Sequence, residues 1–151
     1  MKRLILGIIL ILVAGSAFAQ TQFTYVAKFI CGKTSGTEPA VFAFAPGSYF
    51  TSVNVRNASN VNVTVQKRFS RGNLGETMGI ISPFFAMPLQ PARTAEVECR
   101  SIYAHLNVPL GAFIEGFVEL RSPVELDVEG IYTLQSGTSV AMHMERAIRH
   151  P

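Results

Sequence analysis

The stretch that decides the fold is residues 111–135, GAFIEGFVELRSPVELDVEGIYTLQ, because apolar and polar residues alternate along both of its halves. Successive side chains of a β-strand point to opposite faces, so this alternation predicts two strands that each turn one face to a core. Pro123 cannot donate a hydrogen bond to a strand ladder, which places the connection between the strands at residues 121–123. The stretch therefore predicts two neighbouring β-strands.

The two predicted strands have distinct inner and outer faces. The inner residues of the first strand are Ile114, Gly116, Val118 and Leu120, and its outer residues are Glu115, Phe117, Glu119 and Arg121. The inner residues of the second strand are Leu126, Val128, Gly130, Tyr132 and Leu134, and its outer residues are Glu125, Asp127, Glu129, Ile131 and Thr133. A slip of one residue would bury three carboxylates of the second strand, so the pattern specifies the register strongly.

Further alternating or apolar runs are found at 23–31, 48–56, 61–66, 93–99 and 139–147. Residues 48–56 and 61–66 flank an Asn- and Ser-containing turn, which predicts a β-hairpin. Pro83 and Pro88 interrupt residues 80–89 and favour an edge strand or an irregular segment there. Many short strands with turns between them predict an all-β chain, an antiparallel β-sandwich of immunoglobulin-like or related topology, with one short helical turn near 100–106. An up-and-down barrel is the alternative.

The first residues have the pattern of a secretory signal peptide. Lys2 and Arg3 precede an apolar run, and Ala17-Phe18-Ala19 provides a cleavage site before Gln20. The apolar run is shorter than the roughly 20 residues that span a bilayer, so we expect no stable membrane insertion after cleavage. The sequence predicts a signal peptide at 1–19, a single β-sandwich domain at 20–151, and a periplasmic or secreted protein.

The charge of the chain is close to balanced once the signal peptide is removed. The sequence has 13 Lys and Arg against 10 Asp and Glu, and two of the basic residues are Lys2 and Arg3. Nucleic-acid binding needs a net basic surface, so no nucleic-acid partner is expected. Lys67, Arg68 and Arg71 are interpreted as a solvated loop, and the basic end from Arg146 to Pro151 as a fraying terminus.

Cys31 and Cys99 are the two cysteines of the chain. An even number of cysteines in an exported protein favours a disulfide over a metal pair or a catalytic thiol. The alternative is two separately buried thiols.

Four motifs occur together along the chain: Cys31-Gly32, the Pro46-Gly47-x-Tyr49 motif that leads into 53–57, and two motifs at 116–118 and 122–133. With these motifs the chain resembles a family of exported bacterial proteins that carries no assigned activity. A weaker resemblance covers 51–133, with Pro91-Ala92-Arg93-Thr94 between strands, and is to the small soluble transducer of a microbial sensory rhodopsin. The weaker resemblance implies an oligomeric β-sandwich without enzymatic activity, from which this chain departs in its cysteines and its signal peptide.

Catalytic and metal-binding motifs are weak in this sequence. The chain lacks a G-x-S-x-G motif, and its histidines are His105, His143 and His150, so we predict no enzyme, no catalytic residues, no metal and no cofactor. Met142 and Met144 are interpreted as core residues on the opposite face from His143. Glu125, Asp127 and Glu129 are interpreted as a solvated acidic face, because residues two apart on a strand are too distant to converge on one Ca²⁺.

Two functions follow from these interpretations. The first is a non-catalytic protein-interaction or structural module that binds a protein partner or forms a homo-oligomer. Its candidate interface is the mixed apolar and charged set Phe117, Ile131, Glu115 and Glu119. The alternative is a small-ligand or carbohydrate-binding sandwich that uses exposed aromatics such as Tyr49, Phe50 or Tyr103.

Overall fold

The computed structural model describes residues 22–36, 44–73 and 77–150. The strands are β1 Phe23–Thr34, β2 Gly47–Arg56, β3 Val63–Arg71, β4 Phe85–Leu89, β5 Thr94–Glu98, β6 Ile114–Ser122, β7 Asp127–Ser136, β8 Ser139–Arg146 and β9 Ile148–His150, and the helix is α1 Cys99–Leu106. The predicted all-β class is therefore confirmed, and the predicted helical turn is present as α1. The predicted signal peptide lies outside the described residues.

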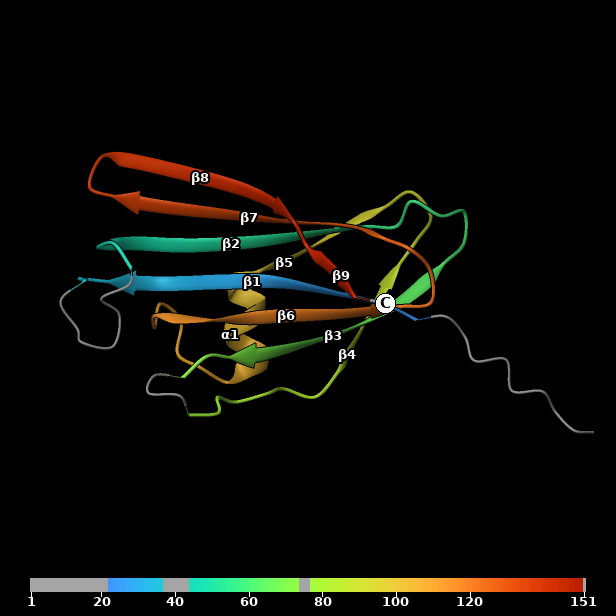
Figure 1. The fold of residues 1–151 in the computed structure, drawn as a ribbon, viewed down its shortest axis with the longest axis horizontal. Helices are drawn as coiled ribbons and strands as arrows, with labels where there is room; N and C mark the ends of the chain where they lie inside the picture. Colours follow the sequence, from blue (N-terminus) through green and yellow to red (C-terminus); the bar gives the residue numbers. More distant parts are fainter. Residues whose placement is uncertain (1–21, 37–43, 74–76, 151) are drawn as a thin grey trace, which may run out of the picture.

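The strands form one curled antiparallel sheet, a half-barrel, in the order β4-β3-β6-β1-β2-β7-β8 (Figure 1). Two short strands lie off this path, since β5 pairs with β2 and β9 pairs with β1. We call β4, β3, β6 and β1 the β1 arm, and β5, β2, β7 and β8 the β2 arm. The arms join where β1 and β2 pair over three residues each.

The prediction that the strands of the deciding stretch are neighbours is wrong. Strand β6 pairs with β1 and β3, whereas β7 pairs with β2 and β8, so β1 and β2 lie between them. The chain crosses from one arm to the other after Ser122. Leu126 is buried at this crossing, and its N–H donates to Tyr25 Oη at 2.8 Å. The alternation correctly predicted the buried residues of 114–120 and 126–130, whereas the predicted inner residues Tyr132 and Leu134 are only half-buried. It holds no information about which strand lies next.

The predicted hairpin of 48–56 and 61–66 is wrong for the same reason. Strand β2 lies in the β2 arm and β3 in the β1 arm, and the connection between them crosses the end of the core. Asn57 is fully buried in this connection. Its Nδ2 donates to the carbonyl oxygens of Val61, Leu89 and Gln90, and its Oδ1 accepts the N–H of Ser59. A buried amide needs such partners, and here they fix a crossing rather than a tight turn.

Two predictions about basic residues are also corrected. Strand β3 extends to Arg71, so Lys67, Arg68 and Arg71 lie in a strand rather than a loop. The predicted fraying end is ordered over Ile148–His150, because these residues form β9 and pair with Thr24–Val26 of β1. Arg149 forms an ion pair with Glu125, and its guanidinium lies 5.1 Å from the centre of the Phe23 ring.

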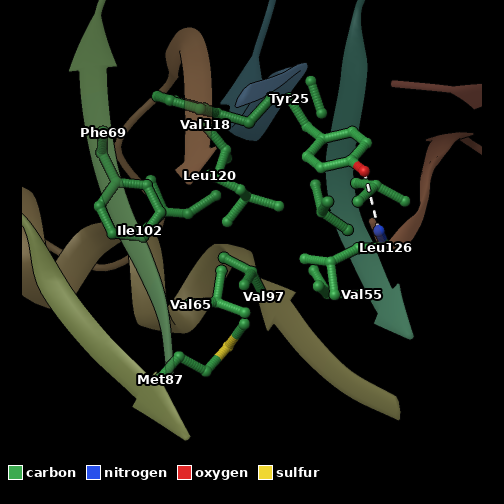
Figure 2. Packing of buried hydrophobic residues seen from close by; sticks show 14 of the residues in the cluster. Tyr25, Val55, Val65, Phe69, Met87, Val97, Ile102, Val118, Leu120 and Leu126 are labelled. Atoms are coloured by element: carbon green, nitrogen blue, oxygen red, sulfur yellow. Dashed lines mark hydrogen bonds between the residues drawn. The ribbon is translucent and has the colours of Figure 1, made fainter. Parts of the chain in front are cut away.

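The hydrophobic core lies between the two arms and α1. Figure 2 shows side chains of both arms meeting there: Phe69, Val118 and Leu120 come from the β1 arm, and Val55 and Val97 from the β2 arm. Helix α1 adds Ile102, Tyr103 and Leu106. The segment 80–89, predicted to be an edge strand or irregular, contains the end strand β4, whose Met87 and Leu89 face this core.

The sheet divides beside the middle of β2, at a place we call the fork. One edge of β2 pairs first with β1, at Gly47–Tyr49, and then with β5, at Ser52–Arg56. The disulfide Cys31–Cys99 joins β1 to the residue that follows β5, which confirms the predicted disulfide. Between the two ladders, the Thr51 hydroxyl accepts the N–H of Ile30 and donates to its carbonyl, both at 2.9 Å. The fork is thus closed by one covalent bond and one side chain.

Gly32 allows β1 to change faces next to the fork. Its φ is +99°, and a Cβ atom there would lie 2.2 Å from the carbonyl oxygen of Ala112. Only glycine adopts this conformation without strain. The alternation of buried residues in β1 shifts at this point, so that β1 can face the core before Gly32 and pair with β2 after it.

Candidate interaction surface

Three of the four predicted interface residues share the outer face of β6. Phe117 is 47% exposed, and Glu115 and Glu119 lie two residues to either side of it. Lys28 of β1 forms an ion pair with Glu115 at 2.5 Å, and its ammonium lies 5.4 Å from the centre of the Phe117 ring. Both carboxylates are paired, because Glu119 contacts Arg68 and Arg121 at 2.6 and 2.7 Å. The outer face of β6 therefore exposes one aromatic ring, Phe117, between two carboxylates that already form ion pairs within the chain.

The fourth predicted residue, Ile131, is not part of that patch. It lies on β7 in the β2 arm, and β1 and β2 separate it from β6. The structure therefore does not bring Phe117 and Ile131 together into one surface.

Ile131 belongs instead to an apolar surface on the β2 arm. Residues directly opposite each other in a sheet share a face. On one side of β7, Ile131 is opposite Met144, Thr133 is opposite Met142, and Gln135 is opposite Val140. On the other side, Thr133 is opposite Phe50. We call the set Phe50, Ile131, Val140, Met142 and Met144 the outer β8 face.

The interpretation of the two methionines as core residues is wrong. Met142 is 66% exposed and Met144 54% exposed, and all eight residues of β8 are exposed. The reason is topological: β8 ends the strand path, and no described element packs on either of its faces. Sequence alternation identifies two faces, but it cannot show that both are open to solvent.

The other face of β8 carries a small polar cluster. His143 stacks on Tyr132 with ring centres 6.2 Å apart, and the Tyr132 hydroxyl donates to Glu145 at 2.7 Å. Burial raises the pKa of Tyr132, and the neighbouring Glu145 carboxylate raises it further. The phenol therefore stays protonated and keeps donating at physiological pH, which helps hold β8 on β7.

Two of the three aromatics predicted to be exposed are buried. Tyr49 is 9% exposed, and its hydroxyl donates to the carbonyl of Ala45 at 2.6 Å. Tyr103 is 5% exposed, and its hydroxyl donates to the carbonyl of Ala112 at 2.8 Å. Phe50 is exposed, and it lines a groove of about 410 Å³ with Glu96, Leu110 and Ile131. Of the three aromatic side chains predicted to bind a sugar, only Phe50 is exposed to a ligand.

Two members of the acidic row form ion pairs with arginines of other strands, and the third lies opposite an arginine. Glu125 pairs with Arg149, and Asp127 pairs with Arg56 at 3.0 Å. Glu129 lies directly opposite Arg146 in the ladder of β7 and β8. Within 22–36, 44–73 and 77–150, no cluster of three or more His, Cys, Asp or Glu side chains could hold a metal ion. The row lines a charged groove of about 720 Å³ whose acids and arginines balance each other.

The three histidines lie on three different elements of the fold. His105 on α1 packs against Phe69 and Phe85, and its Nδ1 lies 2.7 Å from the carbonyl of Ser101 in the same helix. His143 is on β8 and His150 on β9. The structure thus does not gather the predicted weak candidates for acid and base chemistry into one site.

Comparisons with known proteins assign this chain to no family. No family model and no curated protein matches the chain. A solved structure titled "Crystal Structure of Thermotoga maritima 1070" is similar at 8% sequence identity and a TM-score of 0.49, over 84% of this chain and 91% of the other.

The disulfide indicates a location outside the cytosol, where disulfides form and persist. Among the described residues, α1 is too short to cross a membrane and no longer helix is present.

Proposed function

We propose that this protein is a non-catalytic interaction module, exported to the periplasm or secreted, that binds a protein partner through the outer β8 face. The observation that supports this proposal is the exposure of β8. The strand is held by β7 along its whole length, yet it contributes no residue to the core. A strand that buries nothing adds little to the stability of the fold by hydrophobic burial. Its apolar side chains are then best explained by a contact made outside the chain.

The composition of the outer β8 face fits a protein contact. Large apolar side chains that gather on one face of a sheet mark interaction surfaces, whereas single exposed ones are ordinary. The five side chains come from three adjacent strands, β2, β7 and β8. Thioethers adapt to irregular partner surfaces, which suits Met142 and Met144 to this role. The charged rim needed for specificity is supplied by Glu96 and Glu98 on β5, which line the adjoining groove.

Two finer assignments accompany this proposal. The arms act as the two layers of a β-sandwich, supported by the core residues that both contribute. The signal peptide at 1–19 directs export, supported by its three-part pattern and by the disulfide.

The proposal is tested with the double variant Met142→Ser/Met144→Ser. Wild-type and variant proteins, immobilised on beads, are incubated with the exported proteins of the cells that make them, and bound proteins are quantified by mass spectrometry. Sedimentation velocity reports self-association in parallel. We expect the double variant to lose at least about tenfold in affinity, equivalent to about 1.4 kcal/mol, in one of the two assays.

The matched control is Met78→Ser, because Met78 is 97% exposed but lies in the connection between β3 and β4. It should bind like the wild type. Phe117→Ser tests the patch on β6 in the same way. If the folded double variant binds and self-associates like the wild type while Phe117→Ser binds more weakly, the interface lies on β6 and the proposal is wrong.

A further inference from the structure

The free edge of β8 exposes a regular row of backbone hydrogen-bonding groups. The N–H of Ala147 donates to the carbonyl of Val128, which fixes the phase of the ladder between β7 and β8. Bonded pairs alternate along an antiparallel ladder. Ser139, Ala141, His143 and Glu145 therefore bond to β7. Val140, Met142, Met144 and Arg146 point their N–H and C=O groups away from it, and no described strand pairs with them.

The opposite end of the strand path is protected, whereas this one is not. Strand β4 has five residues, includes Pro88, and packs Met87 and Leu89 into the core. Short length and proline are devices that prevent an edge strand from pairing with another chain. Strand β8 has eight residues without proline or lysine, and its side chains are exposed on both faces. An edge of this kind is a template for an added strand.

The sequence of β8 is complementary to itself in one direction. Its charged residues, Glu145 and Arg146, lie at one end, and the first five residues, Ser139–His143, carry no carboxylate, lysine or arginine. Parallel pairing of two copies would place Glu145 against Glu145 and Arg146 against Arg146, which is destabilising. Antiparallel pairing places each charged end against the neutral end of the other strand.

We propose that two copies of this chain pair along β8, antiparallel and about a twofold axis at His143, to form one continuous sheet across the dimer. This proposal rests on the proposed function and names a second copy as the partner. The register follows from the free backbone groups, because only an axis at His143 uses all four outward residues of each strand. Val140 then bonds Arg146 of the second copy, and Met142 bonds Met144 of the second copy.

The side chains agree with this register. Opposed residues share a face, so Met142 and Met144 of both copies meet and join the two outer β8 faces across the axis. On the opposite face, the two His143 rings lie side by side, each stacked on its own Tyr132. The carboxylate of Glu145 is opposite Ala141 of the second copy. No like-charged residues are directly opposed in this arrangement.

The register is tested by cross-linking through an added cysteine. His143 lies at a non-bonded pair on the axis, where opposing Cα atoms are about 4.5 Å apart, a separation that a disulfide spans. We expect His143→Cys protein to form a covalent dimer under mild oxidation. Ala141→Cys is the matched control on the same face. Its two copies would lie about 13 Å apart, four residues along the strand, so it should stay uncross-linked.

Sedimentation velocity of unmodified wild-type protein and of Met144→Lys protein completes the test. The wild type should be a dimer, and Met144→Lys should weaken the dimer by at least about tenfold, because it places two ammonium groups in the apolar stripe. A wild-type monomer, or cross-linking of Ala141→Cys but not His143→Cys, would overturn the inference. A monomer that still captures an exported protein through Met142 and Met144 would leave the proposed function standing with another partner.

Discussion

The fork and the β8 edge are both places where the pairing of strands is interrupted, and they are built in opposite ways. At the fork, β2 exchanges β1 for β5, and the exchange is closed by the disulfide and by the two hydrogen bonds of Thr51. At the β8 edge, the sheet stops with a row of backbone groups that no described residue of the chain satisfies. Thr51 and Cys31 are buried, while every residue of β8 is exposed.

This difference separates residues that maintain the fold from residues that are available for binding. Water can satisfy the backbone groups of β8, so the edge is tolerated in an isolated chain. Thr51 and Cys31 are buried at the fork, so the polar groups packed beside them need partners within the protein. Substitutions at the fork should therefore change stability, and substitutions at the β8 edge should change association.

The largest effect is expected from removing the disulfide. The double variant Cys31→Ser/Cys99→Ser should lose about 4 kcal/mol of unfolding free energy, because the bond closes a loop with a sequence separation of 68 residues. Urea unfolding of the variant and the wild type measures the loss. Met142→Ser is the control at the β8 edge and, at protein concentrations low enough to keep both proteins monomeric, should stay within about 0.5 kcal/mol of the wild type. A loss of similar size in both variants would show that the β8 edge contributes to stability as much as the fork does, and would contradict this comparison.

A smaller effect is expected from Thr51→Val. Valine keeps the shape of the side chain but leaves the N–H and C=O of Ile30 without their partner, which should cost about 1–3 kcal/mol. Thr51→Ser retains the hydroxyl and should recover most of the loss. Thr64→Val in β3 is the exposed control, with an expected change within about 0.5 kcal/mol. Equal unfolding midpoints for Thr51→Val and Thr51→Ser would show that the hydroxyl is dispensable.

The smallest effect on stability is expected from proline substitutions in β8, which test which residues of the strand bond to β7. The N–H of His143 bonds to β7, whereas the N–H of Met144 points to the free edge. His143→Pro should therefore destabilise the fold by at least about 1 kcal/mol more than Met144→Pro, since it removes one more ladder bond. Thermal unfolding of the two variants tests the order. The reverse order would mean that the phase of the ladder, and with it the proposed dimer register, is wrong.

The sequence predicted local features well. Alternation in 114–120 and 126–130 identified the buried faces of β6 and β7, because the period of a strand is a local property of the backbone. Pro88 correctly indicated an end strand, since proline lacks the donor that a central strand needs. The cysteine count, together with the predicted export signal, correctly predicted the disulfide, because disulfides form and persist in oxidising compartments.

The candidate surface could be predicted only in part. The sequence pattern identifies Ile131 as an outer apolar residue but places Met142 and Met144 in the core. In the structure, Met144 lies directly opposite Ile131, and Met142 lies opposite Thr133 on the same face. Their exposure depends on the absence of any described element over β8, and alternation along one strand does not report it. Phe117 was recognised as exposed, but its distance from Ile131 depends on the order of four strands.

The sequence by itself determined the class of the fold, the buried faces of residues 114–120 and 126–130, the short helix and the covalent link between Cys31 and Cys99. These features depend on the backbone period, on the chemistry of single residues and on the compartment. Only the tertiary structure decided that β6 and β7 lie in different arms and that β8 ends the sheet. Strand order depends on how the arms share one core, because Asn57, Thr51 and Tyr25 each find their hydrogen-bond partners on distant segments. These hydrogen bonds satisfy buried polar groups where the chain passes from one arm to the other. No local sequence pattern shows where that passage occurs.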